Sequence, residues 1–398
     1  MNQHISSRVR NLSPSATLEM SRKSGELKAQ GIDVINLSIG EPDFNTPQAI
    51  KDAAVKALEN NVTKYSPVPG FAPLRQAIAD KLLHENGLQY LPEEIMVSSG
   101  AKQSICNALL ALVDEGDEVI IPAPYWVSYP QMVKIAGGTP VFVDAPIEQD
   151  FKITPAQLEA AITPKTRVMI LCSPSNPSGA VYSAEELAGL AKVILAHDDI
   201  IVLSDEIYEH INYIGAHASI AAVPGMRERT VIINGVSKAY AMTGWRIGFI
   251  AGPKWIVAAC NKLQGQYTGG PSSISQKAAE AAWSGPQDCV EQMRQAFQRR
   301  RDLTVRLIKD IPGLVANEPQ GAFYLLPKCS SFYGKSNGSK VINSSSDLAM
   351  YLLEEAHVAI VGGESFGAPD CFRISYAASE EEITEAAARI KAALAKLK

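Results

Sequence analysis

The sequence has few of the residues that build disulfides and metal sites. Its six cysteines are spread along 398 residues, and no two of them form a CxxC pair. Its six histidines include no HExxH pair and no other spacing typical of metal ligands. We therefore expect reduced thiols, as in a reducing compartment, and no metal site.

Other absences exclude whole classes of protein. No apolar run reaches the ~18 residues that a membrane-spanning helix needs, and the start of the chain lacks the apolar core of a signal peptide. The net charge is −5 without any basic run, which argues against nucleic-acid and polybasic membrane partners. Neither a GxGxxG pattern nor a Walker lysine pattern is present. We expect a cytoplasmic protein that is neither a Rossmann dehydrogenase nor a P-loop enzyme.

What remains is the composition of an ordinary globular protein, with 46% hydrophobic and 20% charged residues and a length that allows two domains. Short apolar runs alternate with helix formers, and these runs are 119–121, 139–143, 168–171 and 200–203. The alternation predicts an α/β fold with a mostly parallel sheet and helices on both of its faces. We expect a large domain at 46–290, and an arm plus a smaller α/β domain from 1–45 and 291–398.

Local signals predict several further elements. Thr46 is expected to cap a helix that has Pro47 in its first turn. In the smaller domain, short strands are expected at 321–326, 358–361 and 372–376, and an exposed loop at 330–347.

One lysine, Lys238, lies in a polar loop between two apolar runs, 230–234 and 247–251. Holding an ammonium ion between buried strands is costly, so this lysine is a candidate for Schiff-base chemistry. Ser237 and Arg246 would suit a phosphate group, through a hydroxyl donor and a forked cation. A lysine beside phosphate ligands suggests pyridoxal phosphate.

Polar residues also follow strand ends, where ligands bind in sheets of this kind. The turn 99–103 would point the first amides of a helix at an anion. Asp205 follows a buried strand and should find a cation, for which a pyridinium nitrogen is suitable. Each feature has an ordinary explanation when taken alone: a helix cap for Asp205, a core position for Trp126, and an exposed strand position for Arg373.

Taken in order, these features resemble the class I aminotransferases of fold type I along essentially the full chain. The features are Gly40, Tyr65, 99–102, 125–126, 176–179, 205–208, 237–238, Arg246 and Arg373. The likeness is greatest to the bacterial aspartate aminotransferases of the Iβ group. It is carried by the stretches GEPDF at 40–44, PYWVSYP at 124–130 and SKAYAMTGWR at 237–246.

The resemblance implies an enzyme of amino-acid metabolism that uses pyridoxal 5'-phosphate. Lys238 would form the Schiff base and then move the substrate proton, while Asp205 would keep the ring nitrogen protonated. Tyr208 and Asn176 would bond the phenolic oxygen of the ring, and Trp126 would cover its face. The phosphate would be held by the backbone amides of Ala101 and Lys102, by Ser237 and Arg246, and by Tyr65 from the partner subunit of a homodimer with shared sites.

The resemblance also implies a site for an amino acid with two carboxylates. Arg373 would pair with the α-carboxylate, and Lys102 would meet the distal carboxylate of aspartate or glutamate. The expected reaction is transamination between L-aspartate and 2-oxoglutarate, which gives oxaloacetate and L-glutamate. The substrate-binding set is Gly40, Lys102, Trp126, Asn176, Arg373, Ser15 and Thr17.

Several alternatives stay open. Prephenate-using members of this branch carry a basic residue just before Pro14, and Ser13 stands there, which weakens the case for prephenate. Aromatic amino acids, alanine or kynurenine are other donors. A C–S lyase or a cyclopropane-forming synthase would use the same lysine, aspartate and arginine. A transcription regulator on this fold would need a DNA-binding domain, for which no residues are left.

Overall fold

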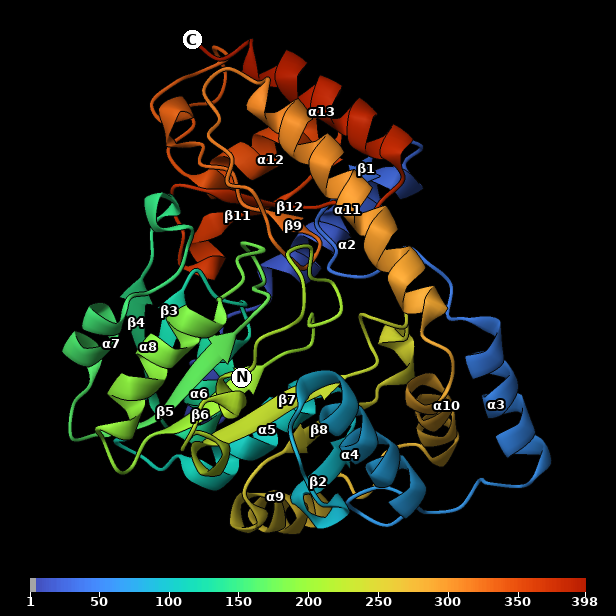
Figure 1. The fold of residues 1–398 in the computed structure, drawn as a ribbon. Helices are drawn as coiled ribbons and strands as arrows, with labels where there is room; N and C mark the ends of the chain where they lie inside the picture. The colour runs from blue at the N-terminus through green and yellow to red at the C-terminus, as the bar shows by residue number, and fades with distance from the viewer. Residues whose placement is uncertain (1–4) are drawn as a thin grey trace.

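The computed structural model describes residues 5–398 (Figure 1). Residues 1–4, which belong to the predicted arm and to the stretch without a signal-peptide core, lie outside this part. Within the described chain, none of the helices combines the length and the apolar character needed to cross a membrane.

A seven-stranded sheet forms the centre of the larger part of the molecule. Its order is β2 (Ile95–Ser98), β8 (Gly248–Ala251), β7 (Thr230–Gly235), β6 (Ile201–Asp205), β5 (Thr166–Cys172), β3 (Glu118–Ala123) and β4 (Thr139–Asp144). Strand β8 runs antiparallel to both of its neighbours, and the other pairs are parallel. The predicted α/β fold with a mostly parallel sheet is confirmed.

Helices cover both faces of this sheet, because alternate strand residues point to opposite sides. Val231 packs in a cluster with helices on one face, and the next residue, Ile232, in a cluster on the other. The first face carries α5 (Ala101–Leu112), α6 (Tyr129–Ala136) and α9 (Lys254–Tyr267). The second carries α3 (Gln48–Glu59), α4 (Ala72–Asn86), α7 (Pro155–Ala161), α8 (Ala184–Leu195) and α10 (Ser273–Ser284).

Side-chain caps fix where several helices begin. Ser183 accepts from the backbone of Glu186 and Thr154 from that of Gln157, and in both cases the second side chain reaches back to the cap. The predicted cap at Thr46 is wrong. Pro47 occupies the cap position of α3, and the Thr46 hydroxyl instead donates to the carbonyl of Ala241 at 2.7 Å.

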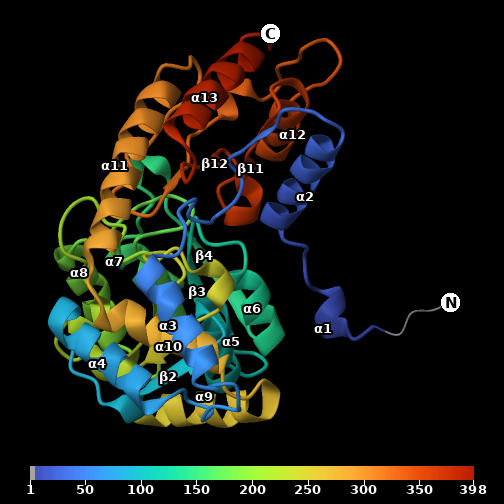
Figure 2. The same cartoon turned by 90° about the vertical axis from the view of Figure 1, so that its right-hand side faces the viewer.

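The remaining elements pack around a separate hydrophobic cluster. Its helices are α2 (Ala16–Ala29), α11 (Asp288–Lys309), α12 (Ser345–Glu355) and α13 (Glu380–Leu394). The short helix α1 (Ser7–Arg10) precedes them and lies beside α6 (Figure 2). The cluster also includes Tyr208 from the loop after β6, so the two parts of the molecule share a core. The division at residues 46 and 290 stays a prediction.

The small strands are shorter than expected. The run 358–361 is interrupted at Ile360, so β10 (Val358–Ala359) pairs with β1 (Ile35–Asn36) while β11 (Val361–Gly362) joins a different sheet. In that sheet β12 (Phe372–Ser375) lies between β11 and β9 (Tyr324–Leu325). The predicted exposed loop at 330–347 is wrong in part, because Phe332 and Ile342 are buried in the core and α12 begins at Ser345.

Candidate active site

A cavity of about 550 Å³ lies where β5 and β6 end, with Cys172 and Asp205 in its wall. The loop after β7, the start of α5, the arm and β12 supply the other walls. This is the position at which open parallel sheets bind ligands. The predicted site residues in the wall are Ser15, Thr17, Gly40, Ala101, Lys102, Trp126, Asn176, Asp205, Tyr208, Ser237, Lys238, Arg246 and Arg373.

Lys238 points its amine into this cavity. Its Nζ donates to the carbonyl oxygen of Gly40 at 2.6 Å, so the loop after β7 is tied to the segment that follows β1. Burial lowers the pKa of Lys238 to about 8, and the nearby guanidinium groups of Arg373 and Arg246 act in the same direction. A larger share of the amine is therefore neutral near pH 7 than in a free lysine, which favours nucleophilic and base chemistry.

Asp205 stands at the end of β6 with only 4% of its surface exposed. Its Oδ2 accepts a hydrogen bond from the Tyr129 hydroxyl at 2.6 Å, and its Oδ1 accepts one from the backbone of Ile207 at 3.3 Å. Burial raises the pKa of Asp205 to about 6 although both donors act against it. A cationic group in the cavity would offset the cost of burying this carboxylate.

The start of α5 forms a cradle for an anion. A side-chain carbon on Gly100 (φ 85°) would overlap the Arg246 guanidinium, and one on Gly248 would overlap the backbone of Ala101. These glycines therefore let the arginine and the first amides of the helix lie close together. Arg246 donates to the carbonyls of Thr243 and Ser99 at 2.9 and 3.3 Å, which fixes its fork. A helix start beside an arginine and the Ser237 hydroxyl fits a phosphate group.

Arg373 on β12 is a buried cation without a carboxylate partner among the described residues. It is 2% exposed, and it donates to Asn176 Oδ1 at 2.9 Å and to the Ser38 carbonyl at 2.6 Å. Its guanidinium lies over the rings of Tyr324 and Phe366, at 4.5 and 4.8 Å from their centres. Its Nε has no hydrogen-bond partner in the described chain. A ligand carboxylate would supply both the negative charge and the hydrogen-bond acceptor that this guanidinium group lacks.

Lys102 offers a further positive charge in the same cavity. Its Nζ lies 4.8 Å from the centre of the Trp126 ring, and burial lowers its pKa. Ser15 and Thr17, at the start of α2, line the same cavity. The cavity therefore holds cations from β12 and from α5, an arrangement that suits a ligand with two carboxylates.

The cavity residues that sequence reasoning missed include Tyr129, Cys172 and Tyr324. Tyr129 belongs to the PYWVSYP stretch, so a signal was present, but nothing local shows that its hydroxyl reaches Asp205. Tyr324 pairs its hydroxyl with that of Tyr208 at 2.8 Å, and a side-chain carbon on Gly40 would overlap it. This tyrosine thus explains why residue 40 is a glycine.

Tyr65 is the predicted site residue that does not line the cavity. It lies in the loop between α3 and α4, and its side chain is fully exposed. Its predicted role at the site of a second subunit stays a prediction.

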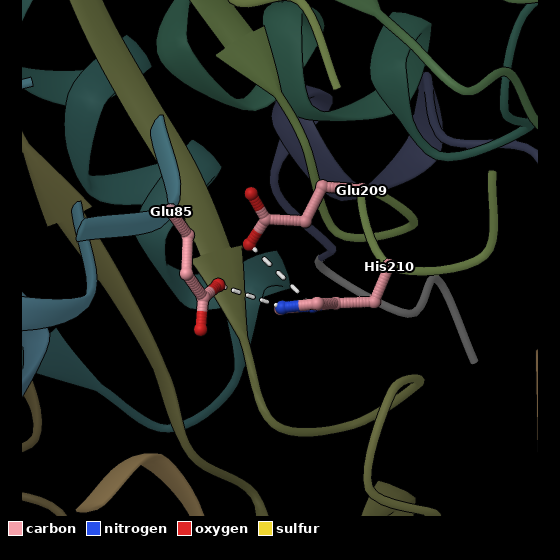
Figure 3. Close-up of side chains that lie close together, drawn as sticks. All are labelled: Glu85, Glu209 and His210. Atoms are coloured by element: carbon pink, nitrogen blue, oxygen red, sulfur yellow. Dashed lines mark hydrogen bonds and ion pairs between the residues drawn. The ribbon is translucent and has the colours of Figure 1, made fainter. Parts of the chain in front are cut away.

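Histidine and glutamate side chains also gather away from the cavity, as Figure 3 shows for Glu85, Glu209 and His210. Nε2 of His210 lies 2.8 Å from Oε2 of Glu85, and Nδ1 of the same ring lies 3.7 Å from Oε1 of Glu209. Glu209 also accepts from Asn234 at 2.7 Å and from the buried ammonium group of Lys81. Burial alone would raise the pKa of Glu209, but Lys81 and the histidines hold it below its usual range. Because Lys81 already supplies the positive charge, these contacts form a network of ion pairs and hydrogen bonds that joins α4 to β7.

Comparisons with known proteins give a consistent result. Residues 32–390 match the family described as aminotransferase class I and II. An aspartate aminotransferase of Geobacillus stearothermophilus is 51% identical over 97% of this chain and 98% of its own length. An aspartate/prephenate aminotransferase of Nitrosomonas europaea is 48% identical over 98% of this chain and 99% of its own. The crystal structure of an aspartate aminotransferase from Rhizobium meliloti covers 99% of this chain and 100% of its own, with a TM-score of 0.96 and 46% identity.

Proposed function

This chain belongs to the class I and II aminotransferase family, and from this premise we propose that it transfers the amino group of L-aspartate to 2-oxoglutarate. The products are oxaloacetate and L-glutamate. The observation that carries the proposal is one cavity that holds Lys238 together with two cations, Arg373 and Lys102. Relatives named aspartate aminotransferase at 49–51% identity support this choice of donor.

We propose pyridoxal 5'-phosphate as the cofactor of this cavity. When bound, it supplies an electron sink for the charge that develops at the substrate Cα. Asp205 would pair with its ring nitrogen, Tyr208 and Asn176 with its phenolic oxygen, and Trp126 with its ring face. Its phosphate would lie with Ala101, Lys102, Ser237 and Arg246. The fit is supported by the buried carboxylate of Asp205, which forms no ion pair within the described part of the chain, and by the cradle at the start of α5.

The protein's own residues then bind the substrate and move its proton. Arg373 holds the α-carboxylate through its fork and its unpartnered Nε, next to Asn176 and the backbone of Gly40. Lys238, with a pKa of about 8, takes the proton from the substrate Cα and would deliver it to the cofactor. Lys102, with Ser15 and Thr17, receives the distal carboxylate.

The test is to add single amino acids to the protein loaded with pyridoxal phosphate and to follow its absorption spectrum. Aspartate and glutamate should convert the cofactor to the amine form fast, and alanine and phenylalanine slowly. In Lys102→Met the rate with aspartate should fall about 10- to 100-fold, because a charge-assisted bond is lost, while the rate with alanine changes little. If the rates with all amino acids fell equally, the Lys102 side chain would support the cofactor and would not bind the distal carboxylate. Pyruvate or ammonia formed without an acceptor would show a lyase instead.

A second donor, arogenate, is the amino acid that corresponds to prephenate, and several relatives carry prephenate in their names. One of them, the aspartate/prephenate aminotransferase of Nitrosomonas europaea, is 48% identical over 98% of this chain. Against this activity, Ser13 brings no positive charge, and its backbone is held by Gln131 at 3.0 Å. Arogenate should be added in the same titration. If it converts the cofactor to the amine form, a basic residue at position 13 is not needed for this donor.

We propose that the active unit is a homodimer in which the partner subunit's Tyr65 completes each phosphate site. The loop that carries Tyr65 is fixed beside the end of α9, because Gln264 Nε2 on that helix donates to the Val68 carbonyl at 2.9 Å. Tyr267, at that end of α9, is 73% exposed. Exposed aromatic side chains of this kind are common in interfaces. Sedimentation of the active enzyme should give a dimer, and a fully active monomer would contradict the assignment of Tyr65.

We also propose that 1–45 with 291–398 form the smaller domain and 46–290 the larger one. The smaller domain carries Arg373, Ser15 and Thr17, so its closure on a substrate with two carboxylates would exclude water from Lys238. The cytoplasm is the proposed location, which is supported by the free state of Cys106, Cys172, Cys260, Cys289, Cys329 and Cys371.

A further inference from the structure

The proposed reaction does not use Tyr129, although this residue is among the most deeply buried tyrosines in the described chain. It is 2% exposed, and its hydroxyl donates to Oδ2 of Asp205 at 2.6 Å. Burial, with the Asp205 carboxylate next to it, raises the pKa of Tyr129 well above its usual value. The hydroxyl therefore keeps its proton at any working pH and acts as a permanent donor to Asp205.

The ring of Tyr129 is held in place by its surroundings. Tyr129 is the first residue of α6, where Pro130 favours a helix start, and its amide donates to the Trp126 carbonyl at 3.0 Å. Its ring meets the Trp126 ring edge-on, with the centres 5.4 Å apart, and it packs among the apolar residues of one sheet face. A hydroxyl on a ring fixed in this way holds the carboxylate in one orientation.

Apart from Tyr129, the groups around Asp205 give the carboxylate little help. The ammonium group of Lys238 also lowers the pKa of Asp205, but it acts through its charge alone and forms no hydrogen bond with the carboxylate. Cys172 is the partner of Asp205 on the neighbouring strand, and burial raises the pKa of that thiol to about 12, so the thiol is neutral. Ile207 contributes one backbone amide at 3.3 Å. Glu206, the next residue, raises the pKa of Asp205 through its charge. Tyr129 therefore gives the shorter of the two hydrogen bonds that stabilise the ionised form of Asp205.

We propose that Tyr129 is a positioning residue that keeps the proton shared by Asp205 and the cofactor on the ring nitrogen. By donating to Oδ2, it lowers the proton affinity of the carboxylate and directs the other oxygen into the cavity. Without this donor, the proton would move from the ring nitrogen to Asp205 and leave two neutral groups, since desolvation favours the uncharged pair. The ring would then be a weaker electron sink. The inference rests on the proposed cofactor.

The variant Tyr129→Phe keeps the ring and removes the donor. In enzyme loaded with pyridoxal phosphate that is ¹⁵N-labelled in the ring, the nitrogen resonance should move from the protonated toward the unprotonated position. The dissociation constant of the cofactor should rise about tenfold, and kcat with aspartate should fall about 10- to 100-fold. Tyr125→Phe is the matched control. Its ring stacks on Phe142 at 4.9 Å, outside the cavity wall, and the same removal of a hydroxyl should leave all three values unchanged.

Two outcomes separate this inference from the proposed function. If the unaltered protein does not bind pyridoxal phosphate, the proposed function fails. If it binds the cofactor with a protonated nitrogen and Tyr129→Phe shows the same resonance, Tyr129 has only a packing role and the inference fails alone. Should Tyr129→Phe not fold, 4-fluorophenylalanine placed at position 129 keeps nearly the shape of tyrosine without a donor. The resonance should again move toward the unprotonated position, and no movement would overturn the inference.

Discussion

The variant Lys238→Ala should lose transaminase activity by a factor on the order of 10⁴ or more, because one side chain supplies both the nucleophile and the base. No other lysine is placed to replace it among the described residues. Lys102, the other lysine in the cavity wall, lies with its Nζ over the Trp126 ring. Steady-state turnover with aspartate and 2-oxoglutarate gives the loss directly.

The variant should still bind the cofactor, since the phosphate cradle and Asp205 do not involve residue 238. Treatment with borohydride should fix the cofactor to the unaltered protein and leave it removable from the variant. Lys262→Ala, on the exposed face of α9, is the control and should behave as the unaltered protein. Ordinary turnover by Lys238→Ala would remove the lysine from the reaction.

The parts of the site that could be predicted are those whose signal is local. Asp205 could be recognised because it directly follows an apolar run, and a carboxylate at the end of a buried strand requires a partner. The cradle at the start of α5 could be predicted for the same reason, since strand, glycine and helix are consecutive in the sequence. The sheet followed from the alternation of its strands with helices.

The rest depends on contacts between distant segments. Thr46 was wrong as a cap because the carbonyl of Ala241, 195 positions away, competes for its hydroxyl. Arg373 alone suggested an exposed strand position, but Asn176, 197 positions away, and the ring of Tyr324 enclose it. Tyr129 was missed because its role depends on the direction of its hydroxyl, which points from α6 to Asp205 at the end of β6. Only tertiary packing fixes such directions.

The second large effect is expected from Arg373→Leu. The substrate α-carboxylate would enter a buried site without its cation, and Asn176 Oδ1 and the Ser38 carbonyl would lose their donor. Truncating one partner of a buried charge pair costs about 2–5 kcal/mol, so kcat/KM should fall by a factor of roughly 30 to 4000. Arg299→Leu, on an exposed part of α11 with 65% of its side chain in solvent, is the control and should change kcat/KM little.

The pattern across donors distinguishes the two cations of the cavity. Every amino acid carries an α-carboxylate, so Arg373→Leu should reduce kcat/KM for aspartate, glutamate, alanine and phenylalanine by similar factors. Lys102→Met should affect the first two much more than the others. Arg373→Lys should recover part of the loss, because it restores the charge without the planar fork that matches a carboxylate. A loss confined to aspartate and glutamate in Arg373→Leu would assign Arg373 to the distal carboxylate and would require a different group for the α-carboxylate.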